Sequence, residues 1–379
     1  MLNKITIKTD HNDKHIIKKA HINFGGNQSF YVKIPLSEKS SITELSDPWL
    51  NILIFKMMAV GGDFYINGTA SESLVSNLEM FSFIWNKWCP DRYKPVHIIP
   101  KTLKTDIIRP GNNRLITAFS GGLDAAYTAY KYKNGLQNGR KYVYDTCVMI
   151  HGADIPVSDK RQFDAAFASA KKMTDDLHLK LIPVITNYRS YNCMWGFEFG
   201  AIISGILSFF SKKFAFGAAT DASVDNFSYP WGMNLISDRF LSSYNFQFIS
   251  DGMEHNRIER ISMIKNWSAC INNLRVCWEN NDKSKNCGKC EKCIRTKLEL
   301  LCLGIKHLPT MPSQFSANDL KYIQNNSHMS FFREIYDFAK AHNSLSPDLL
   351  KQLDEYINAK QKHKKHHHSL FWHLYHMKF

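Results

Sequence analysis

The chain has 379 residues, which is enough for about two domains. Hydrophobic residues make up 44% and aromatic residues 13% of the sequence, so the composition excludes a wholly disordered chain and a collagen-like repeat. Lysine and arginine number 48 against 34 acidic residues, which gives a formal net charge of +14. A basic surface attracts phosphate groups, nucleic acid or acidic lipid, and charge alone does not choose among them.

The N-terminus lacks the apolar region of about 7 to 15 residues that a secretory signal needs. The longest apolar stretch, 202–210, is interrupted by Ser204, Gly205 and Ser208 and is shorter than the ~20 residues of a membrane-spanning helix. We therefore expect a soluble, cytoplasmic protein with no membrane partner. Its nine cysteines are then expected to be thiols or metal ligands rather than disulfides.

Residues 1–105 alternate apolar and polar side chains in short runs, which predicts a small N-terminal α+β domain of unknown role. From residue 114, apolar strands alternate with helical stretches, and this order predicts an α/β fold with a doubly wound parallel sheet. A later helix is expected over 254–267, with Arg257 and Arg260 as surface charges. The predicted strands are 115–119, 143–150, 179–185 and 214–218, and the predicted helices between them are 125–132, 158–177 and 195–211.

Ligands of such sheets bind outside the carboxyl ends of the strands. The first of these ends carries the segment Ala118-Phe119-Ser120-Gly121-Gly122-Leu123-Asp124. Its two glycines permit positive φ, and backbone N–H groups at the start of the following helix form an anion site. Asp124 is expected to cap that helix or to help hold Mg²⁺. The alternative is a tight turn whose glycines are only geometric.

Neither of the two common nucleotide-binding glycine motifs occurs in the sequence. Instead, Ser120-Gly121-Gly122-Leu123-Asp124 resembles the Ser-Gly-Gly-x-Asp-Ser signature of the PP-loop ATP pyrophosphatases. The resemblance implies an adenine nucleotide alpha hydrolase-like fold and a loop that grips the pyrophosphate of ATP while AMP is transferred to a substrate oxygen. It makes Ser120 and Asp124 catalytic candidates. It also makes the whole segment nucleotide-binding: Ala118, Phe119, Ser120, Gly121, Gly122, Leu123 and Asp124.

Ala125 stands where this signature has serine. A hydrogen bond to a charged group is worth about 1.5 to 3 kcal/mol, so its loss weakens phosphate binding about 10- to 150-fold. Backbone donors and the Ser120 hydroxyl remain. We therefore expect an active enzyme, with a catalytically degenerate binding protein as the alternative.

Four cysteines within seventeen residues have metal-ligand spacing: Cys277, Cys287, Cys290 and Cys293. Two C-x-x-C steps share Cys290, and such turns deliver soft ligands to a tetrahedral ion. The pattern predicts a structural Zn²⁺ site over 277–305, with an iron–sulfur cluster or redox thiols as alternatives. The other five cysteines are predicted to be core thiols: Cys89, Cys147, Cys193, Cys270 and Cys302.

The loop, the sheet and the cysteines together, followed by Ile294-Arg295-Thr296, resemble the 7-cyano-7-deazaguanine synthase family, the zinc-containing PP-loop enzymes of the queuosine pathway. Diverged members of this group occur in anti-phage defence, which implies partner proteins from a multi-gene system. The family reaction activates a carboxylate as an acyl adenylate, which ammonia attacks to give an amide, and a second activation dehydrates the amide to a nitrile. The resemblance therefore implies ATP, Mg²⁺ and Zn²⁺ as cofactors, and a small-molecule or protein acceptor.

Within this resemblance, residues 106–276 form the ATP-binding domain. Ile150 and His151, at the end of the second strand of this domain, are expected to contact the adenosine. The family places an Arg-Asn pair near Asn187 and Arg189, and Phe216-Gly-Ala-Ala-Thr-Asp221 looks like its Gly-Ala-x-x-x-Asp segment. The substrate-binding candidates are Asn187, Arg189, Asp221, Asp225 and Trp231.

Residues 306–379 are predicted to form a C-terminal helical extension. Its tail, 360–379, interleaves basic, histidine and aromatic residues without an acid, which suits nucleic acid, an acidic lipid face, a partner protein or simply solvent. Two alternatives to the adenylating enzyme stay open. One is a zinc-stabilised nucleotide or nucleic-acid binding protein, and the other is a PP-loop tRNA-modifying enzyme with Cys193 as its only candidate thiol.

Overall fold

The structure is a computed structural model that describes residues 2–105, 112–221, 230–323 and 329–365. Asp225 and the side chains of the basic tail lie outside the described residues. The chain divides into two compact units, Met1–Asn256 and Arg257–Phe379. Each unit is described by itself.

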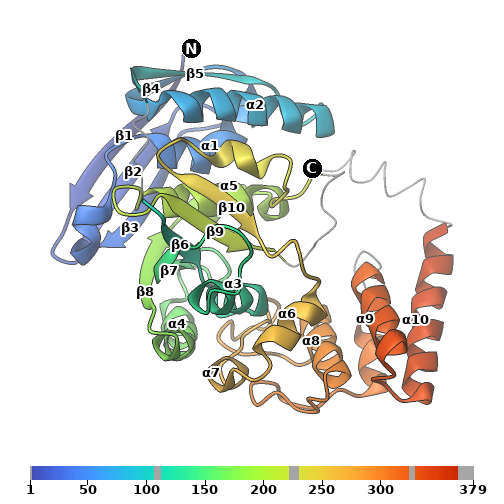
Figure 1. The fold of residues 1–379 in the computed structure, drawn as a ribbon. Coiled ribbons are helices and arrows are strands. Elements are labelled where there is room, and N and C mark those ends of the chain that lie inside the picture. The colour runs from blue at the N-terminus through green and yellow to red at the C-terminus, as the bar shows by residue number, and fades with distance from the viewer. Residues whose placement is uncertain (1, 106–111, 222–229, 324–328, 366–379) are drawn as a thin grey trace. The chain divides into compact units, whose positions relative to one another are not determined.

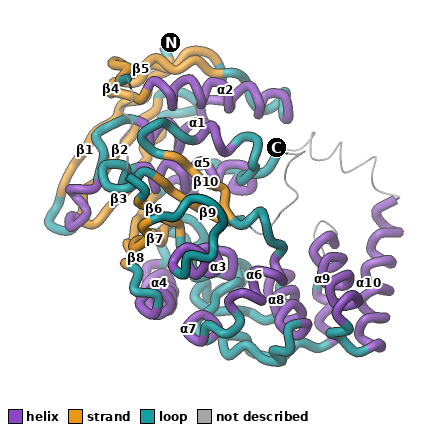
Figure 2. Tube along the Cα trace, in the orientation of Figure 1, coloured by secondary structure: helices purple, strands orange, loops and turns teal. Residues whose placement is uncertain are grey.

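The first unit is built on a ten-stranded sheet with the order β10-β9-β6-β7-β8-β3-β2-β1-β4-β5 (Figures 1 and 2). Neighbouring strands are parallel except across β8-β3-β2-β1. The predicted α/β class is confirmed, with a large and mostly parallel sheet. The strands are β1 (Asn3–His11), β2 (His15–Ile22), β3 (Gln28–Pro35), β4 (Gly62–Ser71), β5 (Val96–Lys104), β6 (Arg114–Ala118), β7 (Val143–His151), β8 (Lys180–Thr186), β9 (Phe216–Thr220) and β10 (Gln247–Asp251).

Helices cover both faces of the parallel half, β10-β9-β6-β7-β8. From β6 to β8 the chain advances in one direction, through α3 (Leu123–Lys133) and α4 (Lys160–Asp176). From β8 it returns past β7 and β6 to β9 through α5 (Trp195–Ser208). Crossovers between parallel strands are right-handed, so the reversal places α5 on the face opposite α3 and α4. Accordingly, α5 packs on β6 and β9 within the main apolar core, whereas α3 and α4 contact β6 to β9 from outside it.

The N-terminal strands belong to the same sheet. β3 pairs antiparallel with β8, with Val32 opposite Thr186. α1 (Asp47–Val60) and α2 (Glu72–Trp88) cover one face of these strands and share one apolar core with α5. The strands of the segment 1–105 therefore extend the parallel half into one continuous sheet. Short helical turns complete the unit: η1 (Leu36–Ser41), η2 (Tyr188–Ser190) and η3 (Asp238–Leu241).

The second unit is helical. Its core joins Ile294 and Leu298 of α8 to Phe332 of α9 and Leu353 of α10. Arg257 and Arg260, which the sequence predicted to be surface charges, are only 3% and 0% exposed. The elements are α6 (Arg257–Ile264), α7 (Ser268–Ile271), α8 (Glu291–Cys302), η4 (Ala317–Tyr322), α9 (Met329–His342) and α10 (Pro347–Lys365).

Candidate nucleotide site and metal centre

The loop between β6 and α3 carries the predicted phosphate site. Phe119 continues β6 by donating its N–H to the carbonyl of Val148, at 2.8 Å. Gly121 then has φ of +74°, a conformation that L side chains rarely adopt. The N–H of Gly122 donates to Ser120 Oγ at 3.3 Å, and Gly122 is the N-cap of α3. Asp124 lies in the first turn of α3.

This loop lies where the strand order of the sheet reverses. β6 has β7 on one side and β9 on the other, and the chain reaches β9 only after returning from β8. In parallel α/β sheets the crevice at such a reversal is the usual ligand site, because the neighbouring crossovers leave to opposite faces there. The backbone N–H groups and the dipole of α3 make this position suited to an anion.

At the end of β7, the His151 ring is packed inside the unit. It stacks on Phe163 with centroids 4.3 Å apart, and its Nε2 lies 2.9 Å from the carbonyl oxygen of Pro156. Burial lowers the pKa of His151, which favours a neutral ring that donates to Pro156. Ile150 packs partly buried against the main apolar core. The structure thus gives His151 a role in holding the loop, and adenosine contact by Ile150 and His151 stays a prediction.

After β8, both predicted substrate contacts bind backbone groups. Asn187 Oδ1 accepts the N–H of Tyr31 at 2.8 Å, and its Nδ2 donates to the carbonyl of Ser29 at 2.9 Å. This side chain therefore continues the pairing of β3 with β8. Arg189 donates to the carbonyl of Ala153 at 2.5 Å, and its guanidinium lies 4.6 Å from the centroid of the Trp195 ring.

Beyond β9, two of the predicted residues lie together. Trp231 Nε1 donates to Asp221 Oδ2 at 2.5 Å, and the Trp231 ring meets Phe199 edge-on. A third acid, Asp238, was not predicted as a site residue, and its side chain is buried at 2% exposure. Desolvation raises the pKa of Asp238 to about 7, against hydrogen bonds from Ser250 and from the N–H of Asn234.

A buried polar network ties α3 to the carboxyl ends of β9 and β10, and it too was missed. Lys131 Nζ lies 2.6 Å from Asp251 Oδ1 and 2.6 Å from Glu254 Oε1. Thr128 and Tyr132 also donate to Asp251, at 2.6 and 2.9 Å. These contacts fix the helix that begins at the Ser120–Asp124 loop. A lysine in a helix with no preceding charge pattern reads as a surface residue, so only its burial reveals its role.

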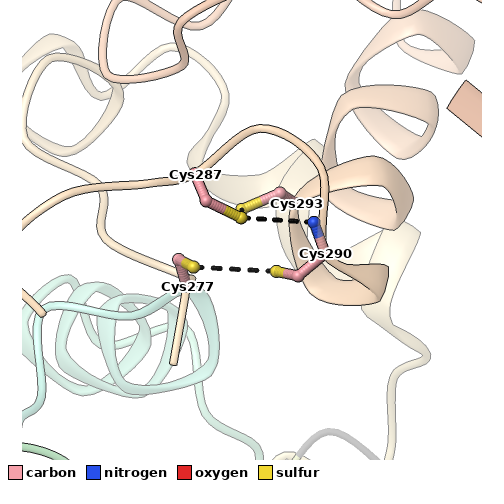
Figure 3. Close-up of side chains that lie close together, drawn as sticks. All are labelled: Cys277, Cys287, Cys290 and Cys293. Carbon is pink, nitrogen blue, oxygen red and sulfur yellow. Dashed lines mark hydrogen bonds between the residues drawn. The ribbon is translucent and has the colours of Figure 1, made fainter. Parts of the chain in front are cut away.

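The four predicted metal ligands converge in the second unit (Figure 3). All four sulfurs lie within 4.8 Å of one another. The Sγ atoms of Cys277 and Cys290 are 3.6 Å apart, and those of Cys287 and Cys293 are 3.9 Å apart. Four sulfurs at zinc–thiolate distance in a tetrahedron lie about 3.8 Å apart. The cluster therefore fits a metal such as zinc.

Backbone groups support these sulfurs. Three N–H groups point to them: Asn280 to Cys277 at 3.3 Å, and Lys289 and Cys290 to Cys287 at 3.4 and 3.2 Å. Such donors stabilise thiolates. Gly288 turns the loop with φ of +74°, and a Cβ there would lie 2.6 Å from the Pro312 ring.

Asn286, which the spacing of the cysteines did not single out, clamps the two ligand loops. Its Oδ1 accepts the N–H groups of Val276 and Cys277, at 2.9 and 3.1 Å. Its Nδ2 donates to the carbonyl of Leu274 at 2.9 Å and to Thr310 Oγ1 at 3.0 Å. It is 7% exposed. This residue links the strand of chain before Cys277 to the turn that holds the other three cysteines.

The remaining cysteines are free thiols, buried at Cys147, Cys270 and Cys302 and partly buried at Cys89 and Cys193. Burial, followed by the nearby Glu198 carboxylate, raises the pKa of Cys193 well above its ordinary value. Cys193 is thus a poor source of thiolate.

Every helix in the described part of the chain is too short or too polar to cross a membrane. Comparison with known proteins identifies no relative: no family model, curated protein or solved structure matches this chain.

Proposed function

We propose that this protein is an ATP-dependent adenylating enzyme of the PP-loop type, which releases pyrophosphate and transfers AMP to a carboxylate acceptor. One observation carries the proposal. The Ser120–Asp124 loop, with a positive-φ glycine and a helix N-terminus behind it, lies at the reversal of strand order in a parallel sheet. The strand order and the sequence motif are independent of each other, and both support a ligand site at this end of the sheet.

The chemistry needs few groups from the protein. Adenylation replaces a poor leaving group, the carboxylate oxygen, by a good one, AMP. Holding ATP in line with the acceptor supplies most of the rate enhancement of the AMP transfer itself. The N–H group of Gly121 and the Ser120 hydroxyl are assigned to the pyrophosphate, with the Gly122 N–H holding the Ser120 side chain. Asp124 and Ser120 bring oxygen donors to one loop, which suits Mg²⁺, and the ion when bound neutralises phosphate charge.

The acceptor is assigned to the edge formed by the loops after β8 and β9. Arg189 supplies a cation there, and Trp231 with Asp221 supplies a ring beside a carboxylate. Asn187 is assigned to holding β3 because both atoms of its amide bind that strand. A zinc ion in the second unit is assigned a structural role, since four cysteines leave no open coordination position.

The direct test is release of pyrophosphate from ATP with Mg²⁺ and a panel of carboxylic acids. We expect turnover by the wild-type chain and loss of at least about 100-fold in Asp124→Asn, in line with removal of one group that stabilises developing charge. Asp175→Asn is the matched control, because Asp175 is an exposed acid on α4. A zinc-loaded, folded preparation that does not bind ATP would contradict the proposal.

Ala125 favours one second candidate, a nucleotide-binding protein without turnover. It predicts ATP binding with no pyrophosphate release for any acceptor, and partner binding that survives Asp124→Asn. The tRNA-thiolating alternative ranks lower, because burial keeps the Cys193 thiol protonated.

A further inference from the structure

The antiparallel part of the sheet has one face that the helices leave open. Alternate residues of β2, namely Ile16, Ala20 and Ile22, enter the apolar core under α1 and α2. The residues between them point the other way and are half-buried. Figure 1 shows α1 and α2 on one side of these strands. The open face of β1 to β4 includes Lys4, Thr6, Lys8, Asp10, His15, Ile17, Lys19, His21, Tyr31, Lys33, Asp63 and Tyr65.

Positive charge gathers on this face. Lys8 and Lys19 stand directly opposite each other on β1 and β2, an arrangement of like charges that destabilises a sheet. Asp10 offsets part of this charge through an ion pair with Lys19 at 2.6 Å. The positive environment also extends to His15, whose pKa is lowered first by burial and then by the neighbouring Lys33 and Lys14. An anionic ligand across these strands would relieve the repulsion.

Two tyrosines lie beside the lysines on this face. Tyr31, Lys19 and Lys8 form one row across β3, β2 and β1. Lys4 and Tyr65 form a second row across β1 and β4, and Lys33 Nζ lies 4.9 Å from the centroid of the Tyr31 ring. Rings flanked by cations on an open sheet suit unpaired bases, which stack while the lysines contact phosphates.

We propose that the open face of β1 to β4 binds single-stranded nucleic acid. The lysines of the two rows contact the backbone, and Tyr31 and Tyr65 stack on bases. This surface is separate from the proposed ATP loop, and its assignment does not depend on adenylation.

The test is fluorescence anisotropy of the full chain with labelled oligouridylate and oligothymidylate of about 20 nucleotides, longer than the site of one binding fold. Affinity is measured between about 50 and 200 mM salt. The charge variant is Lys8→Gln with Lys19→Gln. Its matched control is Lys160→Gln with Lys172→Gln, two exposed lysines of α4. The basic tail is present in every sample, so it contributes equally to each measurement.

We expect the charge variant to reduce the magnitude of the slope of log affinity against log salt by about 1.4. This corresponds to about 0.7 for each lost phosphate contact on a single strand. The control pair should change it much less. Equal losses in the two pairs, or no oligonucleotide binding at low salt, would overturn the proposal.

Substitutions of Tyr31 distinguish binding of a nucleic acid from binding of any other polyanion. Tyr31→Leu should weaken oligonucleotide binding about 5- to 100-fold, since one stacked base is lost, while Tyr31→Phe should bind as the wild type does. Heparin, which has no bases, should bind both variants equally. If Tyr31→Leu leaves oligonucleotide binding unchanged while its thermal unfolding matches the wild type, or weakens heparin equally, the face does not read bases and the proposal fails.

Discussion

Lys131 of α3 and Asp251 at the end of β10 form a buried ion pair, with Nζ and Oδ1 2.6 Å apart and both side chains 5% exposed. Asp251 also accepts hydrogen bonds from Thr128 and Tyr132 of the same helix. One carboxylate thus holds one face of the helix that begins at the Ser120–Asp124 loop. The pair is therefore a constraint on the geometry of that loop as well as on stability.

Removing the carboxylate should be costly. We expect Asp251→Ala to lower the free energy of unfolding by about 3 to 5 kcal/mol, because it leaves the buried Lys131 with only the more exposed Glu254. Lys131→Met with Asp251→Leu should recover part of this loss. Urea denaturation measures both. Asp175→Ala breaks the exposed pair with Lys171 and should cost at most about 1 kcal/mol. Equal losses of unfolding free energy at the two sites would show that Asp251→Ala does not leave an uncompensated buried charge.

Zinc content should depend on the four clustered cysteines and not on the other five thiols. Elemental analysis of the purified chain should find about one zinc and no iron, and Cys290→Ser should lose the metal and unfold at lower temperature, because a three-cysteine site binds zinc less tightly. Cys89→Ser changes a thiol that lies outside the cluster and should keep the metal. Visible absorption and stoichiometric iron would instead indicate an iron–sulfur cluster.

Asn286 should matter to metal affinity without being a ligand. Asn286→Ala removes the side-chain hydrogen bonds to Val276, Cys277, Leu274 and Thr310. We expect zinc affinity to fall about 10- to 100-fold, the usual effect of losing a residue that orients ligands. Competition with a chromophoric chelator measures this. Asn280→Ala is the control: its backbone N–H to Cys277 is retained, and only a side-chain contact to Lys285 is lost. Unchanged zinc affinity in Asn286→Ala would show that Asn286 does not hold the ligand loops in position.

Asp238 should make stability pH-dependent. Its folded-state pKa is raised to about 7, so between about pH 4 and 7 the folded chain holds a proton that the unfolded chain has released. Stability from this group is therefore highest in acid and falls as the pH rises through 7. Asp238→Asn should flatten this fall, with the larger gain in unfolding free energy at pH 8 than at pH 5. Asp175→Asn should leave the profile of unfolding free energy against pH unchanged. A wild-type profile in Asp238→Asn would show that the raised pKa of Asp238 does not cause the pH dependence.

Replacing Ala125 by the serine of the PP-loop signature should strengthen the proposed nucleotide binding. Ala125→Ser adds a hydroxyl at the N-terminal turn of α3, and we expect ATP affinity to rise about 10- to 150-fold, the inverse of the loss estimated for its absence. Isothermal titration calorimetry measures the change. Ala168→Ser, on the exposed side of α4, should have no effect. No gain from Ala125→Ser would mean that the loop does not receive a phosphate at this position.

Local patterns predicted much of the parallel half. The strands around 115–119, 143–150 and 179–185 and the four cysteines were found because apolar periodicity and C-x-x-C spacing are local signals. Interactions between residues far apart in the sequence were not predicted. Nothing near Asn187 shows that it binds β3, since its partners Tyr31 and Ser29 lie more than 150 positions away. Arg260 was predicted to be a surface charge because charged side chains usually face solvent, and Lys131 was not singled out at all. The folded structure shows both residues buried.

The pairing of β3 with β8 also sets an order of events during synthesis. Tyr31 and its partner Asn187 are 156 positions apart, so at ribosomal rates the first strands wait roughly 8 to 30 s for β8 to emerge. During that interval β3 is a free edge with an apolar face. The nascent chain is therefore most prone to aggregation before β8 is made, and a chaperone would act on it then.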